Sequence, residues 1–211
     1  LIYLLIAFSQ GAAVGAGVVV SQYLGAKNEK GVHSSVHTAL AISVILGLAL
    51  TVGGILFSRP LLVWMNTPTE ILQESVTYLQ LYSAGMVFNV VYNMAAGIMN
   101  AAGNSKRSLR YLAVASIVNV ILDLLLIAIF KMGVAGAAIA TNISQIVSCV
   151  LAMLFLMRVP EQYQVKLKEI RMEKKEALRI IKIGLPTGFQ NMVISLSNML
   201  VQNGIADAPT S

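Results

Sequence analysis

The sequence predicts an all-α membrane protein, built as a polytopic bundle of helices. Three observations lead to this fold class. Of the 211 residues, 57% are hydrophobic and only 11% are charged, and the mean hydropathy is +0.77. Long uncharged segments recur along the chain, and basic residues collect in alternate connectors between them. Because a soluble domain carries about 25% charged residues, this composition excludes a cytosolic enzyme, a secreted module and a disordered protein.

Six apolar segments each reach the length that a helix needs to cross a hydrocarbon core of about 30 Å. They cover residues 1–24, 39–58, 78–102, 111–130, 134–157 and 183–205. The chain starts at Leu1 rather than at a methionine, and the polar tail 206–211 interrupts the last segment. We therefore expect a fragment of a larger protein, with six spans of which the last is incomplete.

Basic residues mark one side of the membrane. The connectors 25–37, 103–110 and 158–182 carry thirteen of the fifteen lysines and arginines, and the other two are Arg59 and Lys131. Under the positive-inside rule these three connectors are cytoplasmic, which predicts a multi-pass protein of the plasma (inner) membrane. The rule also accounts for the net charge of +6 without a nucleic-acid partner.

The spans divide the chain into three regions. Region 1–157 holds five transmembrane helices, and region 183–211 begins a further membrane unit with a truncated helix. Between them lies the basic linker 158–182, which we expect to join two halves of a larger protein. Its broken apolar stripe predicts a cytoplasmic interfacial helix, with a solvated linker as the alternative. The stripe consists of Leu167, Ile170, Ala177, Leu178 and Ile181.

Asp123 is the only acidic residue deep within any apolar segment. A carboxylate at that depth costs roughly 2.5–3.5 kcal/mol on insertion scales. Acidic residues buried in membranes usually line ion or substrate paths. We therefore expect Asp123 to be functional. The alternative is a protonated Asp123 that makes a hydrogen bond in helix packing.

Other oxygen-bearing side chains are expected close to the depth of Asp123. Asn119 lies one helical turn before Asp123. The chain is expected to reverse direction at Met132, which lies midway between Asp123 and Thr141 in the sequence. At 1.5 Å per residue, Asp123 and Thr141 both lie about 13 Å below that turn, and Gln145 is level with Asn119. Carboxylate, amide and hydroxyl oxygens suit a hard cation, or a carboxylate that exchanges a proton.

Further polar side chains occur nearby in the sequence. Asn89 and Asn93 are spaced i, i+4 with Tyr92 beside them, and Ser116 lies close to one turn before Asn119. Because amides that face lipid are costly, we expect these side chains, together with Gln145, to face the bundle interior and to line an amphipathic cavity. Interhelical hydrogen bonding is the alternative.

Two other patterns indicate structure rather than chemistry. Gly11 and Gly15 form a G-x-x-x-G pair, which predicts tight helix packing. His33 and His37 could in principle hold a metal, but the sequence offers no third ligand beside them, so we expect them on the surface. The chain has no P-loop, no His-Glu-x-x-His and no paired cysteines. We therefore expect neither an enzyme nor a bound cofactor.

Stretches of this sequence, in the same order and spacing, resemble the multidrug and toxic compound extrusion (MATE) transporters. They are residues 20–28 (VSQYLGAKN), 100–107 (NAAGNSKR), 119–123 (NVILD) and 133–141 (GVAGAAIAT). Residues 184–188 (GLPTG) resemble the start of the seventh helix of that fold. The resemblance extends to about Val201 and implies helices two to seven of twelve. Region 1–157 would then be a partial amino-terminal lobe, and region 183–211 the start of the carboxy-terminal lobe.

The resemblance also implies a function. MATE transporters export cationic or amphipathic drugs in exchange for Na⁺ or H⁺. Asp123, Asn119 and Thr141 match cation-site positions of the amino-terminal lobe, and they would ligate a metal ion only in a Na⁺-coupled member. Asn93 and Ser116 fall near positions that line the substrate cavity. In such members an Asp on the first helix completes the site, and we expect that helix to precede this chain.

We therefore expect part of a secondary active antiporter that works by alternating access. Its partners would be small drugs and the lipid bilayer, and the full-length protein would be monomeric. Two alternatives remain. A related flippase for lipid-linked saccharides typically carries deep bases for the pyrophosphate, and the apolar segments hold none. A membrane scaffold without transport would tolerate apolar replacement of Asp123, Asn119 and Thr141.

Overall fold

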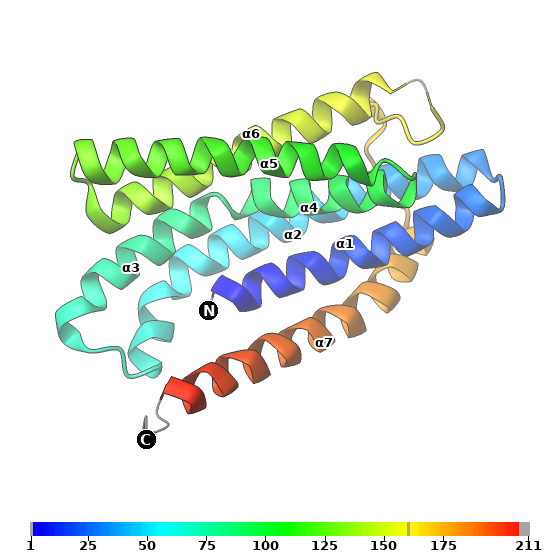
Figure 1. Cartoon of the computed structure of the whole chain (residues 1–211). Coiled ribbons are helices and arrows are strands. Elements are labelled where there is room, and N and C mark those ends of the chain that lie inside the picture. The colour runs from blue at the N-terminus through cyan, green and yellow to red at the C-terminus, as the bar shows by residue number, and fades with distance from the viewer. Residues whose placement is uncertain (1, 160, 207–211) are drawn as a thin grey trace.

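A computed structural model describes residues 2–159 and 161–206, with the side chains of 2–5, 8, 195, 196 and 198–206 outside the description. Most of the tail expected at 206–211 therefore lies outside the described residues. Within them the chain forms a bundle of α-helices (Figure 1). They are α1 (Ile2–Gly25), α2 (Glu29–Trp64), α3 (Thr69–Ala84), α4 (Met86–Ala101), α5 (Ser105–Asp123), α6 (Gly133–Arg158) and α7 (Lys174–Ala206). The predicted all-α membrane fold is confirmed.

The helices are long and apolar enough for a membrane protein. Among the described residues, three segments could cross a bilayer by length and composition: α2, α5 with its continuation to Ile129, and α6. A fourth is added if α3 and α4 count as one bent span. The segments expected at 1–24 and 183–205 form α1 and α7. Figure 1 shows the α1–α2, α4–α5 and α6–α7 connectors at one end of the bundle and the α2–α3 and α5–α6 connectors at the opposite end.

The segment predicted at 78–102 is not one continuous helix, since α3 and α4 meet at Gly85 with a bend of 46°. The cause lies on α6. Asn142 donates its amide N–H to the Leu81 carbonyl over 2.6 Å, which supplies a partner for a carbonyl at the helix break. The Asn142 side chain fits here because Gly85 has no Cβ. A Cβ at position 85 would collide with the Asn142 amide oxygen. A side chain that inserts at the hydrogen-bond ladder is a known cause of helix kinks.

The segment predicted at 111–130 also changes character along its length. α5 ends at Asp123 and continues as a π-helix, η1 (Leu124–Ile129). The turn into α6 follows at once, with positive φ angles of 52° at Lys131 and 56° at Gly133. Glycine adopts that conformation without the steric penalty of a side chain. The hairpin therefore reverses tightly, as the sequence predicted.

The linker differs from the interfacial helix predicted over 158–182. Only a 3-10 turn, η2 (Leu167–Glu169), forms in its middle, and α7 begins at Lys174, inside the predicted range. The reason is burial of the linker in the bundle rather than on a membrane surface. Tyr163 and Val165 are each 2% exposed and belong to the same hydrophobic core as Met94 and Leu156. The linker is therefore packed against the helices.

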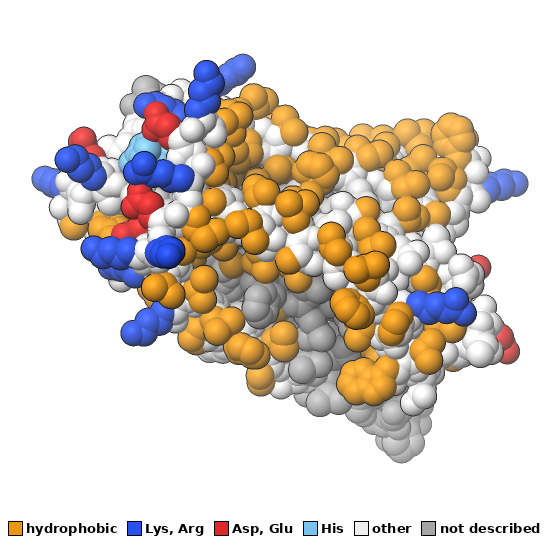
Figure 2. All heavy atoms as spheres, turned by 180° about the vertical axis from the view of Figure 1, so that it is seen from behind, with side chains coloured by type: hydrophobic (Ala, Val, Ile, Leu, Met, Phe, Trp, Pro, Cys, Tyr) orange, Lys and Arg blue, Asp and Glu red, His pale blue; other side chains and the backbone are white. Residues whose placement is uncertain are grey.

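The surface carries the pattern of a membrane protein. In the view of Figure 2, hydrophobic side chains cover the middle of the molecule, and most lysines and arginines gather at one end. That end holds the connectors we expect to be cytoplasmic. Large apolar side chains such as Leu56, Ile117 and Phe130 are more than half exposed. Exposed apolar surface of this extent is stable in lipid rather than in water.

Candidate functional site

Asp123 lies at the junction between α5 and the π-helix η1. Its side chain is half-buried, and its Oδ1 atom is buried without a hydrogen-bond partner in the described part of the chain. A buried acceptor left unpaired costs about 1–3 kcal/mol. The carboxylate oxygen is therefore positioned to gain free energy from a proton or a cation.

Two of the residues predicted to lie near Asp123 share this property. The amide nitrogen of Asn119 and the amide oxygen of Gln145 are also buried without partners among the described residues. Thr141, half-buried on α6, donates its hydroxyl to the Ala137 carbonyl over 2.9 Å, so its oxygen lone pairs are left to accept. α5 and α6 are packed neighbours and are joined by the short turn (Figure 1).

These side chains are not bonded to one another. Within the described residues no hydrogen bond joins Asp123, Asn119, Thr141 or Gln145. An amide supplies an oxygen acceptor as well as its donor nitrogen. The donor set of carboxylate, amide and hydroxyl oxygens fits a hard cation such as Na⁺, and the carboxylate alone fits a proton. The structure leaves polar atoms of Asp123 and Asn119 unpaired, and their predicted role with Thr141 as ion ligands stays a prediction.

The π-helix was not predicted from the sequence. Leu124–Ile129 is a continuous apolar run, and nothing in it signals a wider turn. π-helical turns within α-helices are rare and occur frequently at functional sites. Here the change of helix type follows directly after Asp123, which shifts the register of the later residues relative to an ideal α-helix. The location supports a functional role for this junction.

Asn93 connects α4 to α1. The Asn93 amide nitrogen donates to the carbonyl and side-chain oxygens of Asn89, both at 2.9 Å, and lies 3.4 Å from the Ser9 hydroxyl of α1. The alternative of interhelical hydrogen bonding is therefore realised at Asn93. The same residue also lines a cleft of about 440 Å³ between α1 and α4, together with Gln10, Ser21 and Asn100. Asn93 thus combines a structural bond with access to a cavity.

Tyr92 and Ser116 have other environments. Tyr92 is buried and donates its hydroxyl to the Ser108 carbonyl over 3.0 Å, which ties α4 to α5. Ser116 is exposed on α5 and donates to the Leu112 carbonyl one turn earlier, also over 3.0 Å. The predicted cavity roles of these two residues, and of Asn89 and Gln145, stay predictions.

The predicted tight packing at Gly11 and Gly15 is confirmed, and the partner is α7. A Cβ on Gly15 would lie 2.5 Å from the Ile180 carbonyl oxygen and 2.7 Å from the Gly184 amide nitrogen. Gly11 faces Gly188 in the same way. At the basic end of this contact, Tyr23 donates its hydroxyl to the buried Glu176 over 2.9 Å. The two helices therefore approach backbone to backbone.

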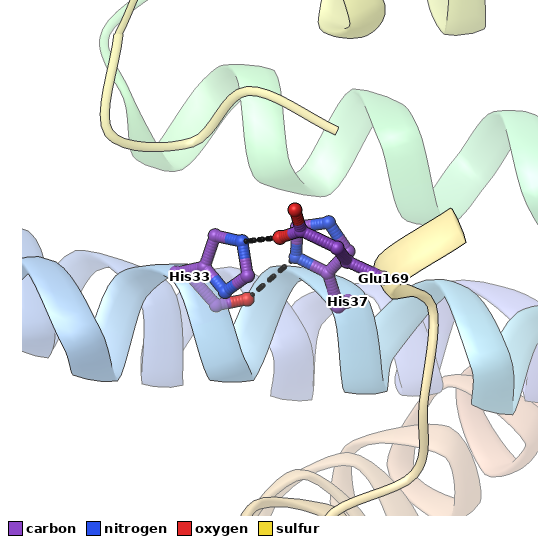
Figure 3. Close-up of side chains that lie close together, drawn as sticks. All are labelled: His33, His37 and Glu169. Atoms are coloured by element: carbon purple, nitrogen blue, oxygen red, sulfur yellow. Dashed lines mark hydrogen bonds and ion pairs between the residues drawn. The ribbon is translucent and has the colours of Figure 1, made fainter. Parts of the chain in front are cut away.

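Of the histidine pair predicted on the surface, the His33 side chain is 40% exposed but His37 is buried, and a third group comes from the linker. Figure 3 shows His33 and His37 on α2 beside Glu169. His33 Nε2 lies 2.7 Å from a Glu169 carboxylate oxygen. His37 is 1% exposed, hydrogen-bonds the His33 carbonyl through Nδ1 at 2.8 Å, and accepts the Lys166 backbone N–H at 3.1 Å.

This arrangement clamps the linker onto α2. The potential ligand atoms of the three side chains lie within 4.8 Å of one another, but both ring nitrogens of His37 are already hydrogen-bonded. The Lys166 ammonium, 3.3 Å from Glu169, and the His33 ring together lower the pKa of the Glu169 carboxyl. Thr38, the residue after His37, accepts the Glu173 backbone N–H over 3.2 Å. In this geometry the three side chains hold the linker against α2 rather than a metal ion.

Known proteins resemble this chain in sequence and in fold. The MatE family model matches residues 1–125. Two curated relatives from Bacillus subtilis (strain 168) are described as probable multidrug resistance proteins. YoeA is 29% identical over 208 residues, which cover 95% of this chain and 45% of the relative. YpnP is 31% identical over 186 residues, which cover 88% of this chain and 41% of the relative.

Two solved structures share the fold. They are described as inward-facing and outward-facing conformations of a multidrug resistance MATE family transporter of the MOP superfamily. Each aligns with a TM-score of 0.86 at 24% identity, over 92% and 94% of this chain respectively and 44% of the solved chain. The chain thus spans less than half the length of the relatives it matches.

Proposed function

The chain belongs to the MatE family, and on that premise we propose that the protein in which it occurs exports drugs in exchange for Na⁺ or H⁺. It is a multi-pass protein of the plasma (inner) membrane, and its relatives are described as multidrug resistance proteins. Because those relatives are more than twice as long as the matched segment, the proposal concerns the whole protein. This chain contributes the ion-coupling residues.

One observation carries the proposal: the unpaired buried oxygen of Asp123, with further unpaired polar atoms at Asn119 and Gln145. In an apolar span, an unpaired carboxylate is costly unless a cation or a proton neutralises it. Asp123 therefore holds the coupling ion in this account, and the Asn119 and Thr141 oxygens add ligands if that ion is Na⁺. Release of the ion restores the cost and favours the other access state.

Alternating access follows from differential affinity. The ion stabilises the state in which Asp123 is neutralised, and the drug stabilises the other state, so each ligand promotes release of its competitor. The matched segment has the same TM-score against an inward-facing and an outward-facing structure. That similarity is expected if the segment largely keeps its fold while access changes.

The substrate class is proposed to be small cationic or amphipathic drugs, carried by a monomer. The cleft beside Asn93 offers amides above small apolar residues such as Ala13 and Gly17. Such a lining suits an amphipathic molecule, because its apolar part displaces water and its polar part retains hydrogen bonds. The described apolar spans hold no deep lysine or arginine, which disfavours a pyrophosphate-bearing lipid as the substrate.

A drug-efflux assay tests the proposal. Asp123→Asn in the full-length protein removes the titratable group and keeps the side-chain size, so efflux is expected to be lost at normal expression. Glu74→Gln, which makes the same change at an exposed position of α3, is the matched control. Normal efflux by Asp123→Asn would contradict ion coupling at this residue. Efflux in Na⁺-free buffer identifies which ion is used.

The scaffold alternative has its own test. A scaffold tolerates apolar replacement of the polar cluster, so Asn119→Leu and Thr141→Val would preserve its function in the cell. In the antiporter account both substitutions remove ion ligands and weaken drug resistance. Retained resistance in both variants, measured as drug tolerance of expressing cells, would contradict the proposed cation site.

A further inference from the structure

A cavity of about 520 Å³ opens between α5 and α6 at the basic end of the molecule. Its rim is polar and carries Arg107 from the first turn of α5 and Arg158 from the last residue of α6. Its inner wall is apolar and consists of Leu151, Leu154 and Phe155. The cavity therefore has a cationic mouth above a hydrophobic wall.

The two arginines are available to a ligand. Both are exposed, and within the described residues neither forms an ion pair. The Arg107 guanidinium carbon lies 4.6 Å from the centroid of the Phe155 ring, a cation–π contact that fixes its position over the apolar wall. A guanidinium presents several N–H donors in a planar fork that matches a phosphate group.

One acid also lines this cavity. Glu161 is exposed, and its carboxylate interacts with the Tyr163 hydroxyl of the linker. Burial of that hydroxyl, together with Glu161, raises the pKa of Tyr163 to about 12. The rim thus carries two positive groups and one negative group, and the excess positive charge remains for an anionic ligand.

The apolar wall continues onto the surface that faces lipid. Leu154 is 37% exposed and Val150, one turn earlier on α6, is 47% exposed. An acyl chain lying along this face of α6 would stay in the hydrocarbon layer while its head reaches the arginines. A free phosphate ion would contact the rim but would gain nothing from Leu151 or Leu154.

We propose that this cavity binds an anionic phospholipid, with its phosphate between Arg107 and Arg158 and an acyl chain against Leu151 and Leu154. Basic pockets between transmembrane helices on the cytoplasmic side are suited to anionic head groups, and each base near the membrane surface contributes about 1 kcal/mol. The site involves none of the residues assigned to ion coupling, so it stands independently of the transport mechanism.

Native mass spectrometry of the full-length protein, released from nanodiscs of phosphatidylcholine and phosphatidylglycerol, tests this proposal. The wild type is expected to retain phosphatidylglycerol in preference to phosphatidylcholine. The double variant Arg107→Gln/Arg158→Gln should retain roughly thirtyfold less phosphatidylglycerol. Lys174→Gln/Lys175→Gln removes the same charge from exposed positions of α7 and should retain as much as the wild type.

Three outcomes would overturn the proposal: equal retention of the two lipids by the wild type, unchanged retention by the arginine variant, or equal loss in the lysine variant. The wild-type comparison holds even if the arginine variant fails to fold. Inorganic phosphate, added in millimolar excess, distinguishes a site for a lipid head group from a site for free phosphate. Retention that persists supports the lipid, and complete displacement by phosphate would contradict it.

Discussion

The backbones of Gly15 in α1 and Gly184 in α7 approach so closely that a methyl group on Gly15 would lie 2.7 Å from the Gly184 amide nitrogen. No real Cβ contact is this short, and the opposing atoms belong to backbone that cannot rotate away. Helices that meet through glycine gain close van der Waals packing along their whole contact. In the MATE-type account this is the contact between the amino-terminal lobe and the first helix of the next lobe.

Substitution at this contact gives the first prediction. Gly15→Ala should destabilise the α1–α7 contact by about 1–3 kcal/mol, the usual cost of overpacking. A lower midpoint of thermal unfolding in detergent would report it. Gly25→Ala is the control, because no atom lies within 4 Å of a Cβ built at that position. Equal midpoints for Gly15→Ala and the wild type would show that the two helices separate without cost.

The linker clamp gives the second prediction. His37→Ala removes the acceptor of the Lys166 backbone N–H and leaves a space in a buried position, so the linker should detach more readily. Limited proteolysis should cut between residues 161 and 173 faster in this variant than in the wild type. Lys168→Ala, at an exposed position of the same linker, controls for altered protease recognition. Unchanged cleavage in His37→Ala would contradict the clamp.

The clamp also predicts a pH dependence. Lys166 and His33 lower the pKa of Glu169 in the folded protein. A carboxyl with a lowered folded pKa contributes stability above its unfolded pKa of about 4.3, and this stability is lost as the pH falls through the folded value. Protease cleavage of the linker should therefore accelerate below about pH 4. Glu169→Gln should remove this acceleration, and an identical pH profile in that variant would contradict the assignment.

Much of the fold is readable from hydropathy because each span must be apolar over its own length. The break at Gly85 is not, because it depends on Asn142, which lies on α6 and inserts its amide at the end of α3. The same holds for the clamp. His33 and His37 share one helix face, but Glu169 reaches them only through the path of the linker.

The candidate ion site was more predictable. Asp123 is conspicuous as an acid in an apolar segment, and the short turn after it predicts Thr141 near its depth on the next helix. The unpaired oxygen of Asp123 then distinguishes it from Tyr92, whose hydroxyl is already donated to Ser108. The π-helix after Asp123 had no signal in the sequence, because Leu124–Ile129 is an apolar run that suits an α-helix equally well.

The central claim is that Asp123 couples an ion to drug binding, and drug-induced ion release measures it most directly. One sample of the purified full-length protein would be loaded with ²²Na⁺ to measure Na⁺ release. A second sample would be held in weakly buffered solution to measure proton release. Each would be mixed with saturating drug. By linkage, drug binding must lower the affinity for the coupled ion. We predict that the wild type and Glu74→Gln release Na⁺ or protons, and that Asp123→Asn binds the drug but releases neither. Equal release from Asp123→Asn would contradict the account.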